Sequence, residues 1–163
     1  TSIHMAGELF KILTKTDIAH VPYRGAGPAM QDLVGGQGIE MICDGLGASA
    51  AQIKGGRIKP LAVAADKRSP AFPDLPTIAE AGVPGYAAPT WTGVIAPAGV
   101  PRPIIDKLNA AINEALLTPA FKAKFEKTGD EAAGGTPEEF AATIKADSAK
   151  WKEVVERAGV KLE

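Results

Sequence analysis

The spacing of hydrophobic and polar positions divides the chain into short helical and extended segments. The first helix is predicted over residues 5–14, where apolar side chains recur every three or four positions. Ser2 stands just ahead of this helix and is expected to be its N-cap. The predicted apolar face consists of Met5, Leu9, Ile12 and Leu13.

Runs of β-branched, aromatic or continuous apolar residues predict four strands. These are residues 17–23, 39–43, 61–65 and 91–96. Three short helices are expected between them, at residues 28–34, 49–54 and 77–81. Pro28 suits a first helical position because its missing N–H would have no helical partner. The glycine pairs 35–36 and 55–56 are expected to close the first two of these helices.

The chain is predicted to be helical from residue 101 to its end. Apolar residues from Ile105 to Phe125 keep helical spacing. A last helix should follow Thr136, because Thr136 and Glu139 have the spacing of a capping box. Its apolar face would consist of Phe140, Ile144, Trp151, Val154 and Val155.

Strands that alternate with helices indicate βαβ units, so the predicted fold class is α/β with a mostly parallel sheet. Residues 84–90 follow a proline-rich stretch and are expected to link two parts. Residues 1–83 would form the α/β part, and residues 91–163 would supply one strand and three helices. These three helices have apolar faces but only one local strand to cover.

Composition narrows the class of protein. The chain has 163 residues, of which 45% are hydrophobic and 23% charged, as in a folded globular protein. A net charge of −1 argues against nucleic acid as a partner, and no apolar run reaches the roughly 18 residues of a membrane span. The chain starts at Thr1 without Met or a visible signal peptide, so we expect a fragment or a processed product.

The segment best suited to bind a ligand is His20-Val21-Pro22-Tyr23-Arg24-Gly25-Ala26-Gly27-Pro28-Ala29, in which a predicted strand turns into a helix. Glycine lets a ligand approach the backbone closely. The helix start adds unpaired N–H groups and the positive end of the helix dipole, which together favour a carboxylate or a phosphate. The alternative is a tight connection that binds nothing.

A second turn of this kind begins at Asp44. Its carboxylate could accept from a ligand, or it could cap the following helix in an Asx turn. Ser2 and His4, near the first helix start, could donate to a carboxylate, or they could be a simple cap and a surface residue. Both turns would meet beyond the carboxyl ends of the predicted parallel strands.

Other chemistries find less support. Gly25-Ala26-Gly27 begins a dinucleotide fingerprint, but Met30 stands where the third glycine belongs, so a nucleotide-binding enzyme domain is kept only as the alternative. The chain has no G-x-S-x-G motif. Its two histidines and its single cysteine, Cys43, form no metal-ligand pattern. No catalytic residue, metal or cofactor is predicted.

Longer stretches of the sequence resemble one known family, the Bug (TctC-like) solute-binding receptors of tripartite tricarboxylate transporters. The stretches are HMAGELFKILTKTDIAHVPYRGAGPAMQDLVGGQ, ADKRSPAFPDLPTIAEAGVPGY, APAGVPRPIIDKLNAAINEAL and GGTPEEFAATIKADSAKWKEVV. The resemblance implies a periplasmic-binding-protein-like (type II-like) fold with two α/β lobes around a hinged cleft. Residues 1–83 would be the second lobe, and residues 91–163 the C-terminal part of an incomplete first lobe.

The resemblance also implies a site and an activity. Such receptors capture a small carboxylate (a di- or tricarboxylic acid, an acidic amino acid or an aromatic acid) without catalysis. The family commonly has Lys where Arg24 stands and often Ser where Ala26 stands, so Ala26 removes a hydroxyl. The ligand-binding residues carried over by position are Ser2, His4, Tyr23, Arg24, Gly25, Ala26, Gly27 and Asp44, with Thr1 a weaker candidate.

Compartment and partners are implied by the same resemblance. The parent protein would be periplasmic, and a membrane permease would receive its ligand. A chain with one complete lobe should bind weakly, because half of the contacts are missing. Helices without a partner sheet favour self-association, with exchange between copies at residues 84–90.

Overall fold

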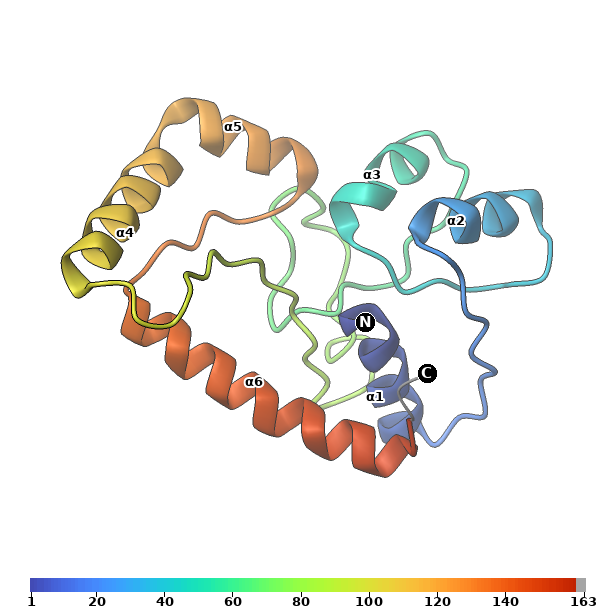
Figure 1. Cartoon of the computed structure of the whole chain (residues 1–163). Coiled ribbons are helices and arrows are strands. Elements are labelled where there is room, and N and C mark those ends of the chain that lie inside the picture. The colour runs from blue at the N-terminus through green and yellow to red at the C-terminus, as the bar shows by residue number, and fades with distance from the viewer. Residues whose placement is uncertain (161–163) are drawn as a thin grey trace.

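The computed structural model describes residues 1–160, except the side chains of residues 127 and 128. Six helices make up its regular structure within that range, and long irregular segments connect them (Figure 1). The helices are α1 (Ser2–Thr14), α2 (Ala26–Gly35), α3 (Leu46–Lys54), α4 (Arg102–Leu117), α5 (Pro119–Thr128) and α6 (Pro137–Ala158).

The predicted α/β fold class is wrong for this chain. Residues 17–23, 39–43, 61–65 and 91–96 form no strand of a sheet, and the described residues contain one isolated parallel bridge, between Val63 and Thr77. A strand exists only through hydrogen bonds to a neighbouring strand. No backbone hydrogen bond joins any two of these four segments within residues 1–160. Their residue types favour extended backbone, but they do not supply the neighbour.

Helix starts and ends follow the sequence closely, with three corrections. Thr1, not Ser2, is the N-cap of α1, and its hydroxyl accepts from the His4 N–H. Helix α2 begins at Ala26, so Pro28 lies in its first turn instead of at its first position. Residues 77–81 form a turn and no helix, although Thr77 and Glu80 exchange the hydrogen bonds of a capping box.

The capping box that begins the last helix is confirmed. The Thr136 hydroxyl accepts from the Glu139 N–H at 3.1 Å, and the Glu139 carboxylate accepts from the Thr136 N–H at 2.8 Å. Gly36 ends α2 in the left-handed conformation with φ of 66°, as the glycine pair predicts. These features form within a few residues of each other, so the local sequence determines them.

The core lies where α1, α6 and residues 83–88 meet. Tyr86 is the most buried large side chain, with 2% of its surface exposed, and it packs with Ala6 and Ala88. Helices α1 and α6 contact each other, which brings the two ends of the described chain together (Figure 1). The partly buried residues around this cluster are Leu9, Phe10, Ala64, Ile78, Val83 and Trp151. Residues 84–90, predicted as a linker, therefore include part of the core.

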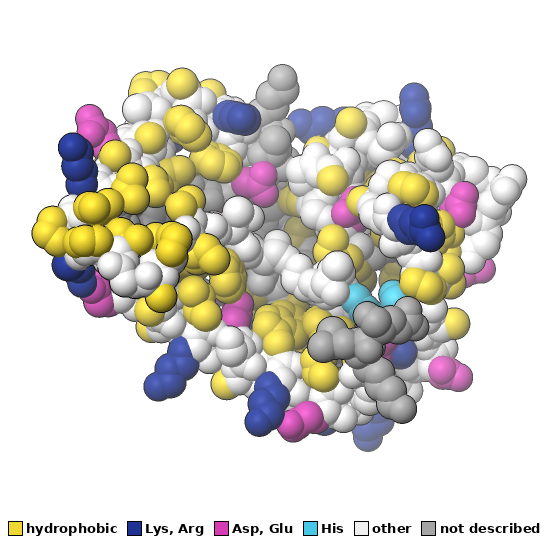
Figure 2. Space-filling model, in the orientation of Figure 1, with side chains coloured by type: hydrophobic (Ala, Val, Ile, Leu, Met, Phe, Trp, Pro, Cys, Tyr) yellow, Lys and Arg dark blue, Asp and Glu magenta, His cyan; other side chains and the backbone are white. Residues whose placement is uncertain are grey.

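The C-terminal helices leave much apolar surface uncovered. Figure 2 shows hydrophobic side chains gathered over α4 and the segment that precedes it. Val94 and Ile95 are 72% and 81% exposed, and Leu108 and Leu117 on α4 are also exposed. This agrees with the expectation that these helices lack a cover. Within residues 1–160, no helix has both the length and the apolar character needed to cross a bilayer.

Candidate functional site

The start of α2 leaves its first backbone N–H groups without a side-chain cap. Gly25 is the N-cap residue and has a φ of 109°, a conformation that residues with a side chain rarely adopt. No side chain caps this helix start, so its first N–H groups keep their bonding capacity. A Cβ atom added at Gly25 or Gly27 would meet nothing within 4 Å. The backbone here is open to a ligand and is not covered by the protein's own side chains.

The start of α3 repeats this arrangement. Gly45 is its N-cap, no side chain caps the helix, and the space beside Gly45 is open. Asp44 stands just before it and accepts a hydrogen bond of 3.0 Å from the Ser49 hydroxyl. The carboxylate is therefore held by a side chain of α3, and it does not form the helix cap that the Asx alternative predicts. This contact leaves its other oxygen available.

Tyr23 and Arg24, which precede the α2 turn, differ in their surroundings. The Tyr23 hydroxyl donates to Asp32 on α2 at 2.7 Å, and this bond raises the pKa of the Tyr23 phenol. It also fixes the approach of the chain to α2. Arg24 is exposed and has no ion-pair partner in the part of the chain that the structure describes. Arg24 is thus the cation nearest in sequence to the open turn.

His4 is the site residue with the most contacts. Its Nε2 lies 3.5 Å from the Glu8 carboxylate, and its ring stacks on the His20 ring with centroids 3.8 Å apart and planes 7° from parallel. Burial and then the neighbouring His20 lower the pKa of the His4 imidazole. Ser2 is exposed at the start of α1.

The structure groups only some of the predicted site residues. His4 is joined to the segment before α2 through His20, and Tyr23 is joined to α2 through Asp32. No hydrogen bond or ion pair among the described residues connects Asp44 with the α2 turn. His20 opens the segment that the sequence indicates for ligand binding, but it is not among the predicted site residues. No local signal points to its stacking, because 16 positions separate the two rings.

Cys43 has no sign of reactivity. It is half-buried, and burial raises the pKa of its thiol, which keeps it protonated. No group of three histidine, cysteine, aspartate or glutamate side chains among the described residues is arranged to hold a metal ion.

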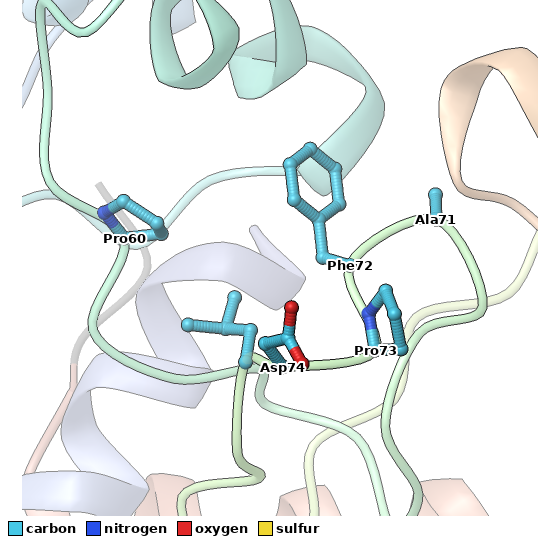
Figure 3. Close-up of a pocket in the computed structure, with 6 residues that line it drawn as sticks. Pro60, Ala71, Phe72, Pro73 and Asp74 are labelled. Carbon is cyan, nitrogen blue, oxygen red and sulfur yellow. The ribbon is translucent and has the colours of Figure 1, made fainter.

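Surface hollows among the described residues lie elsewhere, and two of them are large enough to compare with the candidate site. The larger, about 320 Å³, is lined by Pro60, Ala71, Phe72, Pro73, Asp74 and Leu75 (Figure 3). Its one charged lining residue is acidic and would repel a carboxylate. The second, about 130 Å³, lies between α4, α5 and residues 132–135. Neither includes a predicted ligand-binding residue.

The chain belongs to the tripartite tricarboxylate transporter family receptors (TctC), since the model of that family matches residues 1–160. This is a family of periplasmic binding proteins that are not enzymes. The match to the family model confirms the resemblance seen in the sequence. It does not support the alternative of a nucleotide-binding enzyme domain.

Individual relatives agree with this assignment. The protein is 39% identical over 156 residues to a UPF0065 protein in the tcbD-tcbE intergenic region of Pseudomonas sp. (strain P51), covering 95% of this chain and 46% of the relative. It is 38% identical to the solved structure of R. palustris Rpa4515 with adipate. That match has a TM-score of 0.86 and covers 98% of this chain and 53% of the other.

Two further solved structures are similar. The periplasmic binding protein BugD is 33% identical, with a TM-score of 0.82 over 98% of this chain and 54% of its own. MatC from Rhodopseudomonas palustris with bound malate is 34% identical, with a TM-score of 0.77 over 93% of this chain and 52% of its own. The chain spans about half the length of these relatives. Its path in space follows theirs, although its extended segments form no sheet.

Proposed function

We propose that the protein captures a small carboxylate, with dicarboxylates the first candidates, for a tripartite tricarboxylate transporter. The observation that carries this proposal is the open, uncapped start of α2 at Gly25 in a chain of this receptor family. Two similar solved structures contain adipate and malate, both dicarboxylates. We further propose the periplasm as the compartment and a membrane permease as the partner.

The proposed site combines polar groups from three helix starts. The N–H groups of Gly25, Ala26 and Gly27 would receive one carboxylate, with Arg24 supplying the nearest side-chain charge. Ser2 and His4 would contribute from α1, and Tyr23 would hold the loop in place through Asp32. Asp44 would orient a hydroxyl or a water beside the ligand, while Ser49 holds its other oxygen.

The activity would be capture without turnover. Backbone N–H groups bind a carboxylate without reacting with it. Among the described residues no base accepts a hydrogen bond from the Ser2 hydroxyl, so nothing activates it as a nucleophile. Each charge-assisted hydrogen bond contributes about 1.5–3 kcal/mol, so a chain that holds only half of the contacts would bind with an affinity closer to millimolar than micromolar. Any ligand that is bound should leave unchanged.

Thermal shift with a panel of acids tests this function. Adipate, malate, citrate, glutamate and nicotinate are compared with adipamide, which has the shape of adipate but no carboxylate. A ligand at 100 times its Kd stabilises a protein by about 2.7 kcal/mol, which would raise Tm by about 5–10 °C here. The result expected is a rise with at least one acid and none with adipamide. A folded protein that responds to no acid would contradict the proposal.

A further inference from the structure

The two histidines form a pair that links α1 to the segment before α2. His4 lies in the first turn of α1, and His20 lies three positions before Tyr23. Their rings stack at 3.8 Å between centroids, and Figure 2 shows the two histidine side chains next to each other at the surface. These are the only histidines in the sequence. The pair therefore lies between two of the elements that carry the proposed ligand-binding residues.

Most of the bonding capacity of this pair is unused. Glu8 contacts Nε2 of His4, and no hydrogen bond within residues 1–160 involves Nδ1 of His4 or either ring nitrogen of His20. His20 is exposed and His4 is half-buried, so solvent and ligands can reach them. A protonated imidazole has two N–H donors and no acceptor, which suits a carboxylate oxygen.

The charges around the pair decide how many protons it holds. The charged groups that face it among the described residues are Glu8, the amino group of Thr1 and, through Glu8, Lys11. Glu8 is shared between His4 and Lys11, so it compensates for only part of a positive charge on the rings. Two protonated rings in a stack would repel each other strongly. A ligand carboxylate would supply the missing negative charge.

We propose that His20 is a ligand-binding residue together with His4, and that the stacked pair takes up a proton when a carboxylate binds. This inference rests on the proposed function. It adds His20 to the same site and makes ligand binding there depend on pH. The receptor would bind its acid more tightly as the pH falls.

The direction follows from linkage. Without ligand, burial and the neighbouring ring lower the pKa of His4, so the His4 ring is mostly neutral at pH 7. A bound carboxylate favours the charged ring and raises its pKa. At a pH between the imidazole pKa of the free protein and that of the complex, the complex holds more protons than the separate protein and ligand. Affinity therefore rises with falling pH, by at most about tenfold per pH unit for each proton taken up.

The test is calorimetry of adipate and malate binding at pH 6.0, 6.8 and 7.5, where both acids are mainly ionised. Each titration is repeated in two buffers of different ionisation enthalpy, which counts the protons exchanged. The wild type should take up a measurable fraction of a proton, and at most about one, per acid bound. The H20Q variant should take up fewer, losing about tenfold in affinity at pH 6.0, as expected for one charge-assisted hydrogen bond, and less than about twofold at pH 7.5.

Two controls keep the result interpretable. The D17N variant removes an exposed charge from the same segment and should leave proton uptake unchanged. NMR of the two imidazole signals in the wild type requires no variant and should show a pKa rise on adding adipate. Binding without proton uptake, or H20Q with unchanged uptake and affinity, would overturn this inference alone. Absence of binding to either acid at every pH would overturn the proposed function and this inference with it.

Discussion

The phenol of Tyr86 donates a hydrogen bond of 3.0 Å to the main-chain carbonyl of Ala6, 80 positions earlier in the chain. This hydrogen bond holds residues 84–90 against the middle of α1. The Tyr86 ring also packs edge-on against the Phe10 ring, with 6.3 Å between the centroids. The backbone N–H of Ala88 bonds the Ala64 carbonyl at 2.7 Å, which adds a second attachment. The segment predicted as a linker is thus held to the first half of the chain at two points.

The Y86F variant measures the first attachment. It keeps the ring and removes the donor, so we expect a loss of about 1 kcal/mol in the free energy of unfolding by urea. Burial raises the pKa of the Tyr86 phenol, so the folded protein keeps the proton above pH 10 while the unfolded chain releases it. Stability of the wild type should therefore fall above pH 10, and Y86F should lack that part of the fall. Equal curves for both proteins at every pH would contradict the hydrogen bond.

The capping box of α6 gives a second prediction. The T136A variant removes the hydroxyl that accepts from the Glu139 N–H, and it should lower stability by about 1 kcal/mol. The Thr136 N–H lowers the pKa of the Glu139 carboxylate, so this group stabilises the fold above the unfolded pKa and the contribution is lost as the pH falls toward the lowered value. The matched comparison is T143A at an exposed position of the same helix. Its hydroxyl donates only to the Glu139 carbonyl within the helix, so its loss should change stability little.

Variants of Gly25 and Gly27, at the start of α2, distinguish effects on stability from effects on ligand binding. The G25A variant places a side chain at a φ of 109° and should destabilise the protein by about 1 kcal/mol or more. Gly27 lies within α2 with open space around it, so G27A should stabilise by about 0.4–1 kcal/mol. If the turn binds the carboxylate, the G27A methyl group should nevertheless weaken adipate binding in calorimetry. Unchanged affinity in a stabilised G27A protein would place the ligand elsewhere.

Asp44 and Ser49 distinguish a ligand contact from a structural bond. The S49A variant removes the donor of the 3.0 Å hydrogen bond, and D44N replaces its charged acceptor with a neutral amide oxygen. Each should cost about 0.5–1.5 kcal/mol of stability. Only D44N should also lower the affinity for malate, whose hydroxyl could donate to the carboxylate. Thermal unfolding and calorimetry on the two variants provide the comparison. Equal affinities would assign Asp44 a purely structural role.

Local features of this fold could be predicted from the sequence, and non-local ones could not. The Thr136–Glu139 box and the left-handed Gly36 form between residues a few positions apart, so their sequence signals are sufficient. Thr77 and Glu80 show the limit, since the same box forms there without a helix to follow it. The residues after it, with Gly82 and Pro84, end the helical path within one turn.

The prediction of four strands was wrong because strands depend on non-local contacts. Residues such as Ile39 and Val94 have the types found in strands, but strand formation depends on a partner segment, which the local sequence does not reveal. The candidate site also contains both local features, which the sequence predicts, and non-local ones, which it does not. The open glycine turn at Gly25 could be predicted from its residues, whereas the stacking of His20 on His4 depends on how α1 and the following segment fold back.

Self-association remains a prediction, and the surface before α4 allows it to be tested. Val94 and Ile95 are 72% and 81% exposed, and their backbone lies in an extended segment without a neighbouring strand. Both features favour pairing with a second copy, because pairing buries apolar area and satisfies the open edge. The average mass in sedimentation or light scattering should therefore rise with concentration. The V94K/I95K variant should lower it, since two charges on the surface oppose burial. The control L61K changes a residue that is 63% exposed in the first half of the chain and should leave the mass unchanged.

A wild type that is monomeric at all concentrations would contradict self-association. Equal effects of V94K/I95K and L61K on the average mass would place the contact on another surface.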